Sequence, residues 1–347
     1  MTTSYPAIPA DLQDLIREKF EAAKSSKALT YYPTEVAILK IHGIPFQLRF
    51  SPALAHKPTT TTTRHQGGDT KRGDGDGEHD DAAVASDPFA KPAAELLICD
   101  LPPSHRLVLN KFAVVPEHFI LATRAFAEQT HLLTEGDLAA VHALVRAWAG
   151  VAAREELFAF YNSGPGSGAS QRHRHVQFLP VERMREGLGH EADWEVLLDG
   201  LTEASTPRLP FAYFVAAMPP DPSPAQLSAI YRDLYERACR AVTAWSAANA
   251  PTEPLVRSDD VAAISYNLGV TNRAMILCPR RAGGFEISGG EHGRERAVVE
   301  LNGTMLAGTL LVKHEMEWDA LRNDERQFAE LLEAVGIPSS FTGTGIV

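Results

Sequence analysis

The sequence predicts an α+β protein made of two similar half-units, each with an antiparallel sheet and flanking helices. Three observations lead to this prediction. Short runs rich in β-branched and aromatic residues occur in neighbouring pairs, and two long stretches carry apolar residues at helical spacing. The order strand, strand, helix, strand, strand occurs roughly twice along the chain. Strands joined by short turns pair in antiparallel fashion, so the helices are expected to pack against the sheets.

The elements of the first half follow from hydrophobic periodicity. Residues 10–26 have apolar positions at helical spacing, and residues 35–50 predict two strands around a His-Gly-Ile-Pro turn. Residues 105–126 predict two further strands that meet at a Val-Pro-Glu turn. An amphipathic helix is predicted over 134–153, because the following apolar side chains share one face: Leu138, Val141, Leu144, Val145 and Trp148.

The second half repeats the theme less regularly. It follows a strand at 156–162, a glycine-rich loop and a strand at 172–181. Residues 208–218 are typical of a strand, 223–248 of a long helix, and 263–281 of another pair of strands. A last helix is predicted near 316–335. The repeat is too long and too imprecise for a solenoid, so an internal duplication is a hypothesis.

Composition narrows the classes of function. The chain has 347 residues and a formal net charge of −11, which argues against a general nucleic-acid binder. We expect no secretory signal and no transmembrane helix, because no basic segment precedes an apolar run and no run reaches about 18 apolar residues. Cys99, Cys239 and Cys278 lie far apart, which fits free thiols in a reducing compartment and offers no structural zinc site.

A break in composition divides the first half. Residues 58–86 combine a threonine run, glycines and alternating charges with almost nothing to bury. We expect residues 58–87 to be a disordered insertion. Residues 1–57 and 88–185 then form the N-terminal half, and residues 186–347 form the C-terminal half.

The stretch YNSGPGSGASQRHRHVQ, residues 161–177, carries the candidate chemistry. On a strand, His173, His175 and Gln177 face the same side. From the histidines alone three interpretations stay open: ordinary surface or interior histidines, a metal pair, or a catalytic pair. A metal pair finds no Cys or acidic partner at ligand spacing. The loop matches neither a dinucleotide-binding glycine motif nor a P-loop, because a strand follows it and no GK[ST] is present.

The glycines before the histidines favour a catalytic interpretation. Glycines let backbone N–H groups turn toward an anion, and the serines of the loop add hydroxyl donors. A neutral imidazole is nucleophilic near pH 7 and leaves readily in a second step. The loop and the pair together therefore predict attack of a histidine on phosphorus, with the loop donors spreading the charge.

The pattern N-S-G-P-x-S-G-A-S-Q-x-H-x-H-x-Q resembles the active-site signature of the diadenosine tetraphosphate (Ap4A) phosphorylases, or ATP adenylyltransferases. These belong to the galactose-1-phosphate uridylyltransferase-like branch of the histidine-triad superfamily. The blocks FSPALAHKP, DPFAKP, LVLNKFAVVPEHFILAT, ISYNLGVT and NGTMLAGTLLVK are also similar to that family and stand in its order. The resemblance implies a histidine-triad-like fold with two half-units in one monomer.

The resemblance also implies roles for individual residues. His175 would attack the α-phosphorus and release ATP, after which inorganic phosphate would take the adenylyl group as ADP. Gln177 would donate to a phosphate oxygen, and His173 would orient His175. The remaining nucleotide contacts that it implies are Lys57, Asn110, Lys111, Asn162, Gly168, Ala169, Ser170, Gln171, Asn302, Gly303, Thr304, Thr309 and Lys313.

Cofactors and partners follow from the same resemblance. Mg²⁺ is expected to arrive with the polyphosphate, and no protein-bound metal is expected. The expected partners are small molecules, namely Ap4A, ATP, ADP and phosphate, bound by a cytoplasmic monomer that also has access to the nucleus. Other functions stay open: a GDP-sugar or other dinucleotide phosphorylase, a hydrolase, or a nucleotide sensor without turnover. The preference for adenine over guanine is not fixed by the sequence.

Overall fold

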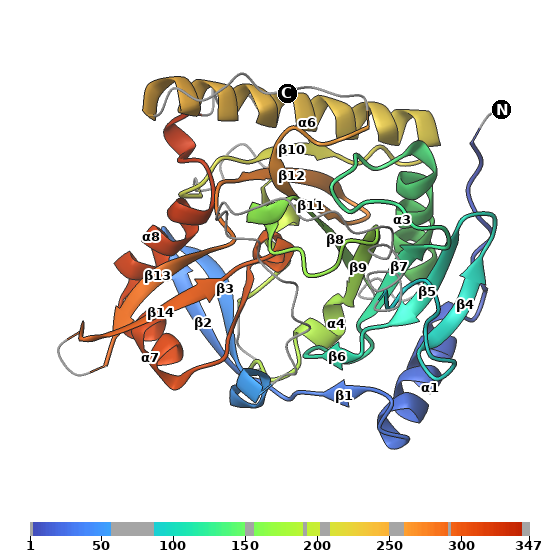
Figure 1. Ribbon diagram of the computed structural model, residues 1–347, viewed down its shortest axis with the longest axis horizontal. Helices are drawn as coiled ribbons and strands as arrows, with labels where there is room; N and C mark the ends of the chain where they lie inside the picture. The colour runs from blue at the N-terminus through green and yellow to red at the C-terminus, as the bar shows by residue number, and fades with distance from the viewer. Residues whose placement is uncertain are drawn as a thin grey trace, which may run out of the picture.

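The computed structural model describes residues 3–56, 87–149, 156–189, 193–201, 209–249, 260–290 and 293–341. An eight-stranded antiparallel sheet runs through the molecule (Figure 1) in the order β10-β12-β11-β8-β9-β7-β5-β4. Its strands are β4 (Leu97–Leu101), β5 (His105–Leu109), β7 (Phe119–Thr123), β8 (Leu157–Ser163), β9 (His175–Pro180), β10 (Phe214–Ala217), β11 (Ser265–Val270) and β12 (Ala274–Arg280).

The two halves of this sheet repeat one arrangement. The first half runs β7, α3 (Glu135–Trp148), β8, β9, and the second runs β10, α6 (Pro224–Asn249), β11, β12. The strand order is β8-β9-β7 in the first and β11-β12-β10 in the second, and β8 pairs with β11 where they meet. The α+β fold of two similar half-units is confirmed. In the second half one strand, β10, precedes the helix, as the pattern of residues 208–218 predicts, so the repeat of two strands before a helix is incomplete there.

One face of the sheet is covered by helices. The helices α1 (Leu12–Ser25), α3 and α6 pack there, and α6 lies across the top of the view in Figure 1. The expected apolar face of α3 is buried, from Leu138 to Trp148. A capping box starts this helix, because Thr134 and Asp137 bond each other's backbone N–H groups and satisfy two donors at its first turn.

Smaller sheets and helices cover the other face. They enclose a second apolar core that includes Phe46, Phe160 and Trp194. The elements of this layer are the sheet β15-β3-β2, the hairpin β13-β14, and the helices α7 and α8 at the left of Figure 1. Their bounds are β2 (Glu35–Ile41), β3 (Ile44–Phe50), β13 (Gly284–Gly289), β14 (Glu295–Glu300), β15 (Thr309–Val312), α7 (Glu315–Asn323) and α8 (Glu325–Val335).

Three details of this layer and its surroundings differ from the sequence prediction. The last helix is two helices, because the Asp324 side chain accepts from the N–H groups of Arg326 and Gln327 and so starts α8. The hairpin β13-β14 was not predicted. A short parallel pair, β1 (Thr30–Tyr31) with β6 (Phe112–Ala113), ties the segment after α1 to the turn before β7.

Most of the predicted insertion, residues 58–86, lies outside the described residues. All three cysteines are free thiols, and Cys239 and Cys278 are buried. Within the described ranges, no helix combines the length and the apolar character needed to cross a membrane.

Candidate active site

His175 is the first residue of β9, and its ring is held in one orientation. Its Nδ1 lies 2.7 Å from the backbone oxygen of His173. A carbonyl oxygen can only accept, so Nδ1 carries the proton and donates it. The other ring nitrogen, Nε2, is therefore the one with a lone pair. Within the described residues Nε2 makes no hydrogen bond.

The surroundings of His175 keep its ring neutral. The residue is 4% exposed, and the ring of Phe89 lies 4.9 Å from it, centroid to centroid. Burial lowers the pKa of His175 to about 4, because the charged form loses its hydration, while the hydrogen bond to the His173 carbonyl opposes this shift. At neutral pH the imidazole is thus uncharged and keeps the lone pair of Nε2.

His173 precedes β9 and is fixed from two sides. Its Nδ1 lies 2.7 Å from Oδ2 of Asp87, and its Nε2 lies 2.9 Å from the hydroxyl of Thr123. The strand begins three residues later than predicted, and His173 forms only an isolated bridge with Glu128. Asp87 was predicted to end the disordered insertion, but it packs against this ring. The carboxylate of Asp87 thereby fixes the residue whose carbonyl orients His175.

Gln177 belongs to a relay of hydrogen bonds that no short-range pattern indicates. The amide nitrogen of Asn110 lies 2.9 Å from Nδ1 of His118, and Nε2 of His118 lies 3.1 Å from the amide oxygen of Gln177. An amide nitrogen can only donate, so His118 accepts at Nδ1 and donates from Nε2. The Gln177 oxygen is the acceptor, which leaves the Gln177 nitrogen available to donate to a ligand.

Gln129 joins β8 and β9 where their pairing ends. Its amide oxygen accepts from the N–H of His175 at 2.8 Å. Its amide nitrogen donates to the backbone oxygens of Asn162, at 2.8 Å, and of His175, at 3.2 Å. Gln129 is 2% exposed, and all these bonds are buried. It therefore fixes the backbone of His175 relative to β8.

The glycine-rich loop is a tight turn packed against the second half. Gly168 has a φ of +78°, and a Cβ there would come within 2.6 Å of the Leu301 oxygen, so no larger residue fits. The Ser167 hydroxyl donates to the Gly164 oxygen at 2.6 Å and accepts from the N–H of Ala169 at 3.3 Å. Ala169 and Ser170 are exposed, and Gln171 is half-buried. This part of the loop is open to a ligand.

Asn162 joins the two halves of the site. Its amide oxygen accepts from the Asn267 side chain at 2.8 Å and from the N–H of Gly303 at 2.9 Å. Asn302 is arranged similarly, since its amide oxygen accepts from the N–H and hydroxyl of Thr304. In both residues the oxygen is occupied, so the amide nitrogen remains as the donor. The structure brings Asn162, Gly168, Asn302, Gly303 and Thr304 together.

The other predicted contacts lie apart from this group. The Lys111 ammonium lies 5.6 Å from the centre of the Phe112 ring, and Lys313 pairs with Glu300 at 3.5 Å. Thr309 is buried on β15, with its hydroxyl 3.4 Å from the Gln47 amide oxygen. No contact connects these three residues to the histidine pair within the described chain. Lys57 lies outside the described residues.

Arg280 stabilises the contact between Asn162 and Asn267, where the two halves of the site meet. Its guanidinium donates to the side-chain oxygen of Asn267, and at 2.8 to 3.1 Å to the carbonyls of Ala282, Leu301 and Val335. The residue is 4% exposed. Burial lowers its pKa to about 10, so it remains a cation at neutral pH. A buried positive charge thus stands two hydrogen bonds from Asn162.

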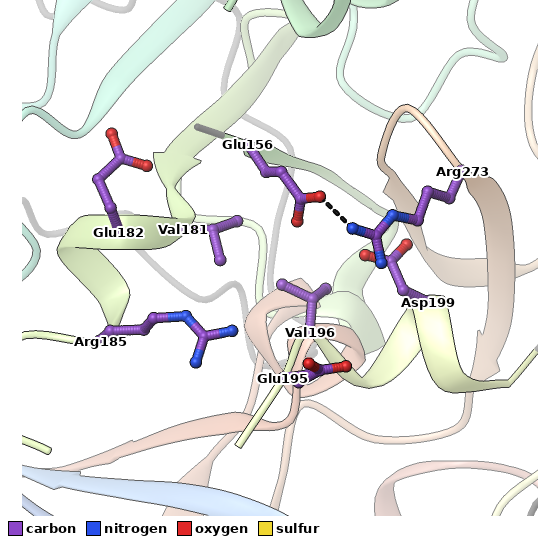
Figure 2. A pocket seen from close by; sticks show the side chains of 8 residues that line it. All are labelled: Glu156, Val181, Glu182, Arg185, Glu195, Val196, Asp199 and Arg273. Atoms are coloured by element: carbon purple, nitrogen blue, oxygen red, sulfur yellow. Dashed lines mark hydrogen bonds and ion pairs between the residues drawn. The ribbon is translucent and has the colours of Figure 1, made fainter. Parts of the chain in front are cut away.

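A cavity of about 490 Å³ lies at the far end of β8 and β9. Figure 2 shows Glu156 bound to Arg273 on one side of it, with Glu182 and Arg185 on the other. Val181, on its wall, follows the last residue of β9, whereas His175 is the first. Five residues of strand span roughly 17 Å, so this cavity is separate from the histidine pair.

A neutral, oriented imidazole beside a turn with exposed backbone donors suits transfer at phosphorus. The amide nitrogens of Gln177, Asn162 and Asn302 remain as donors, because hydrogen bonds hold the oxygens of these amides. No group of three His, Cys, Asp or Glu residues in the described ranges is placed to hold a metal ion. The fold and the site together are those of a nucleotidyltransferase.

Comparisons with known proteins give the family. Residues 2–191 match the model of the Ap4A phosphorylase N-terminal domain, and residues 207–338 match that of the ATP adenylyltransferase C-terminal domain. The chain therefore belongs to the Ap4A phosphorylase family of nucleotidyltransferases.

Individual relatives in Saccharomyces cerevisiae cover almost the whole chain. Diadenosine 5',5'''-P1,P4-tetraphosphate phosphorylase 2 is 27% identical over 96% of this chain and 97% of its own, and Protein APA1 is 26% identical over the same shares. The crystal structure of yeast Ap4A phosphorylase Apa2 in complex with Ap4A has a TM-score of 0.68 at 25% identity. That match covers 96% of this chain and 99% of the other.

Several residues of the site escaped the sequence analysis. They are Asp87, Phe89, His118, Thr123, Gln129, Asn267 and Arg280. Asp87 and Phe89 belong to the DPFAKP block, and His118 belongs to the block LVLNKFAVVPEHFILAT, so attention to polar and aromatic residues within those blocks would have found them. Gln129 and Arg280 reach the site through contacts that no local pattern encodes.

Proposed function

We propose that this chain cleaves Ap4A with inorganic phosphate into ATP and ADP, through an adenylyl group carried on Nε2 of His175. One observation supports this above the others: Nδ1 of His175 is committed to the His173 carbonyl, and burial keeps the ring neutral. A neutral imidazole with one free, oriented lone pair is the form that attacks phosphorus.

The first step forms an N–P bond and breaks a P–O bond. The lone pair of Nε2 attacks the α-phosphorus, and the bridging oxygen leaves with its electron pair as part of ATP. The imidazole becomes cationic, while its Nδ1 proton stays on the ring and donates to the His173 oxygen. That carbonyl dipole stabilises the positive charge, and the Asp87 carboxylate keeps His173 in place.

Fixed donors then stabilise the charge on the phosphoryl oxygens. The Gln177 nitrogen donates from one side, held there by His118, and the Asn162 nitrogen donates from β8. The backbone N–H of the exposed Ser170 adds a donor, whereas that of Ala169 already donates to the Ser167 hydroxyl. Because these groups are held before the substrate arrives, little reorganisation is needed in the transition state.

The second step returns the histidine to its starting state. An oxygen of inorganic phosphate attacks the adenylyl phosphorus, and the N–P bond breaks with its electron pair returning to Nε2. The products are ADP and the neutral imidazole, with no net proton taken up by His175. A neutral imidazole is a good leaving group from phosphorus.

The remaining assignments belong to the same proposal. Mg²⁺ would be held mainly by the oxygens of the polyphosphate and would offset its charge, since the described residues offer no three-ligand cluster for it. Lys57, Lys111, Thr309 and Lys313 are proposed nucleotide contacts by family resemblance. The enzyme is proposed to act as a monomer in the cytoplasm, with access to the nucleus.

The test is a product analysis with and without inorganic phosphate. Purified enzyme is mixed with Ap4A, and the nucleotides are separated by chromatography. ATP and ADP in equal amounts, formed only with phosphate, are expected. ATP plus AMP without any need for phosphate would identify a hydrolase. Turnover of a GDP-sugar but not of Ap4A would identify a different phosphorylase.

A further inference from the structure

A second cavity, of about 600 Å³, opens beside His173 at the end of the sheet where β5 begins and β7 ends. Three arginines line it, namely Arg106, Arg124 and Arg174. Three cations in one cavity form a local positive patch in a chain whose formal net charge is −11. None of these arginines takes part in the catalytic arrangement described above.

Nearby carboxylates do not neutralise the three cations. Asp137 accepts from Arg174 at 2.9 Å, from His105 at 2.8 Å and from the N–H and hydroxyl of Thr134 at 2.8 Å each. Burial raises the pKa of Asp137, but the bond from His105 and the charge of Arg174 outweigh it and hold that pKa below its ordinary value. The Asp137 carboxylate is already engaged by four hydrogen bonds, so it does not offset the charges of Arg106 and Arg124.

The other two arginines share one carboxylate. The Nε atoms of Arg106 and Arg124 lie 3.6 and 3.9 Å from the same oxygen of Asp100, whose side chain is 45% exposed. Among the described residues, the three guanidinium cations of this cavity are therefore paired with two carboxylates, those of Asp100 and Asp137. In addition, the Nε–H groups of Arg106 and Arg174 are buried without a hydrogen-bond partner among the described residues. Unsatisfied buried donors on cations are costly, so an anion at this cavity would relieve the repulsion.

The cavity touches the catalytic pair through its own wall. The Thr123 hydroxyl, which lines the cavity, lies 2.9 Å from Nε2 of His173. Phe126, also on the wall, is 56% exposed, and its ring centre lies 5.4 Å from that of His173. An exposed aromatic ring beside arginines offers a stacking surface for a base and charge for its phosphates.

We propose that this cavity is an oxyanion subsite that holds the phosphate chain of the departing nucleotide, with Phe126 as the surface on which its base stacks. Only the identity of the occupant rests on the proposed function. The recognition itself requires an oxyanion with several phosphate oxygens. Inorganic phosphate, the acceptor of the second step, shares that chemistry and is the other source that the experiment distinguishes.

The test is calorimetric titration of the full-length protein with tripolyphosphate, inorganic phosphate and AMP in turn. Arg124→Glu is the variant of choice, because this side chain is 45% exposed and its only described ion pair is the 3.9 Å contact with Asp100. We expect about tenfold weaker binding of tripolyphosphate, with AMP unchanged. The matched control is Arg172→Glu, an arginine 70% exposed near His173 but outside the cavity, which should bind all three as the wild type does.

Each outcome assigns or overturns the subsite. A loss confined to inorganic phosphate keeps the oxyanion site and gives it to the acceptor. In a further titration with ATP, Phe126→Ala should weaken the binding of ATP more than that of tripolyphosphate, because of these two ligands only ATP has a base. Unchanged affinities in Arg124→Glu, or an equal loss in Arg172→Glu, would overturn the proposal. Titration needs no turnover, so a wild type that fails to form ATP and ADP would defeat the proposed reaction and leave this result standing.

Discussion

The two halves of the central sheet share an arrangement, but they use it differently. On β12, Cys278 lies opposite Asn267. The ladder of β8 and β9 ends at Phe160 with Gln177, and its register continued by two residues would place His175 opposite Asn162. Cys278 is fully buried, and burial raises its pKa to about 12, so its thiol stays protonated. The first half thus has the proposed nucleophile at a position where the second half has an inert core residue.

Asn162 and Asn267, which bind each other where the two halves meet, also differ in their availability to a ligand. The side-chain nitrogen of Asn162 remains available to donate. Both polar atoms of the Asn267 amide are already bound: its oxygen accepts from Arg280, and its nitrogen donates to the Asn162 side chain and to the Ser167 oxygen. The second half therefore supplies rigidity, and the first supplies reactive groups. One arrangement of strands can serve both purposes because the difference lies in a few side chains.

The largest expected difference between the halves is in turnover. His175→Ala should lower the rate of ATP release from Ap4A by about 10⁴-fold or more, because no other group replaces the nucleophile. Cys278→Ala, at the corresponding position of β12, should retain the rate within about twofold. Single-turnover chromatography measures both, and comparable losses in the two variants would show that the halves share the chemistry.

The second expected difference is in stability. Arg280→Met removes the guanidinium donor from the carbonyls of Ala282 and Leu301 and from the Asn267 oxygen, whereas the Val335 carbonyl keeps its bond from the N–H of Arg281. We expect the substitution to reduce the free energy of unfolding by about 2 to 4 kcal/mol. The control, Arg296→Met on the exposed side of the hairpin, should stay within about 0.5 kcal/mol. Urea titration followed by circular dichroism compares them. A small loss in Arg280→Met would mean that the junction is held by other contacts.

A smaller effect is expected from the relay behind Gln177. His118→Phe keeps a ring but removes both hydrogen bonds, so Gln177 loses its orientation and kcat should fall about tenfold while AMP binding persists. His142→Phe is the matched control, since His142 is equally buried on α3 but remote from the site. If His118→Phe and the wild type have equal kcat, the relay does not position Gln177.

The smallest effect concerns pH. Because burial lowers the pKa of His175 to about 4, release of ATP in the first step should stay nearly constant from pH 7 down to about 5. A histidine with the ordinary pKa of about 6.5 would lose half of its reactive form at about pH 6.5 and nearly all of it by about pH 5.

The same lowered pKa of His175 makes the free energy of unfolding depend on pH. The unfolded state binds more protons at this position between about pH 4 and 6.5, so the contribution of His175 to stability is complete above that window and is lost as pH falls through it. Single-turnover rates and urea midpoints at half-unit pH steps test both statements. A rate that halves near pH 6.5 would show that the ring is solvated.

The sequence predicted those parts of the molecule that local periodicity encodes. The helix α3 and the strands β2, β3, β8, β11 and β12 lie close to their expected ranges. The helix buries one regular face, and β8, β11 and β12 are short runs buried along nearly their whole length. The hairpin β13-β14 was missed because only Ile287 and Val299 of its strands are buried, too few to give a pattern. The start of a new helix at Asp324 could have been predicted from the sequence, since aspartate is a common residue at the first position of a helix.

Within the site, the glycine-rich turn and the residues of β9 were recognisable as one signature. The groups that orient them come from distant segments: Asp87 lies 86 residues before its partner, and Gln129 lies 46 residues before His175. Side-chain contacts over such separations depend on how the strands assemble, and no spacing in the chain reports them. Even the predicted alignment of His173 with the strand was wrong, because the backbone leaves the ladder before His175.

The most direct test of the account is to trap the adenylyl group. Enzyme is mixed with Ap4A without inorganic phosphate, quenched, digested and examined by mass spectrometry. We expect one AMP on the peptide that contains His175, its site assigned by fragmentation, and its loss as ADP when phosphate is added before the quench. AMP attached to His173, or full turnover with no covalent species at any time, would contradict the account.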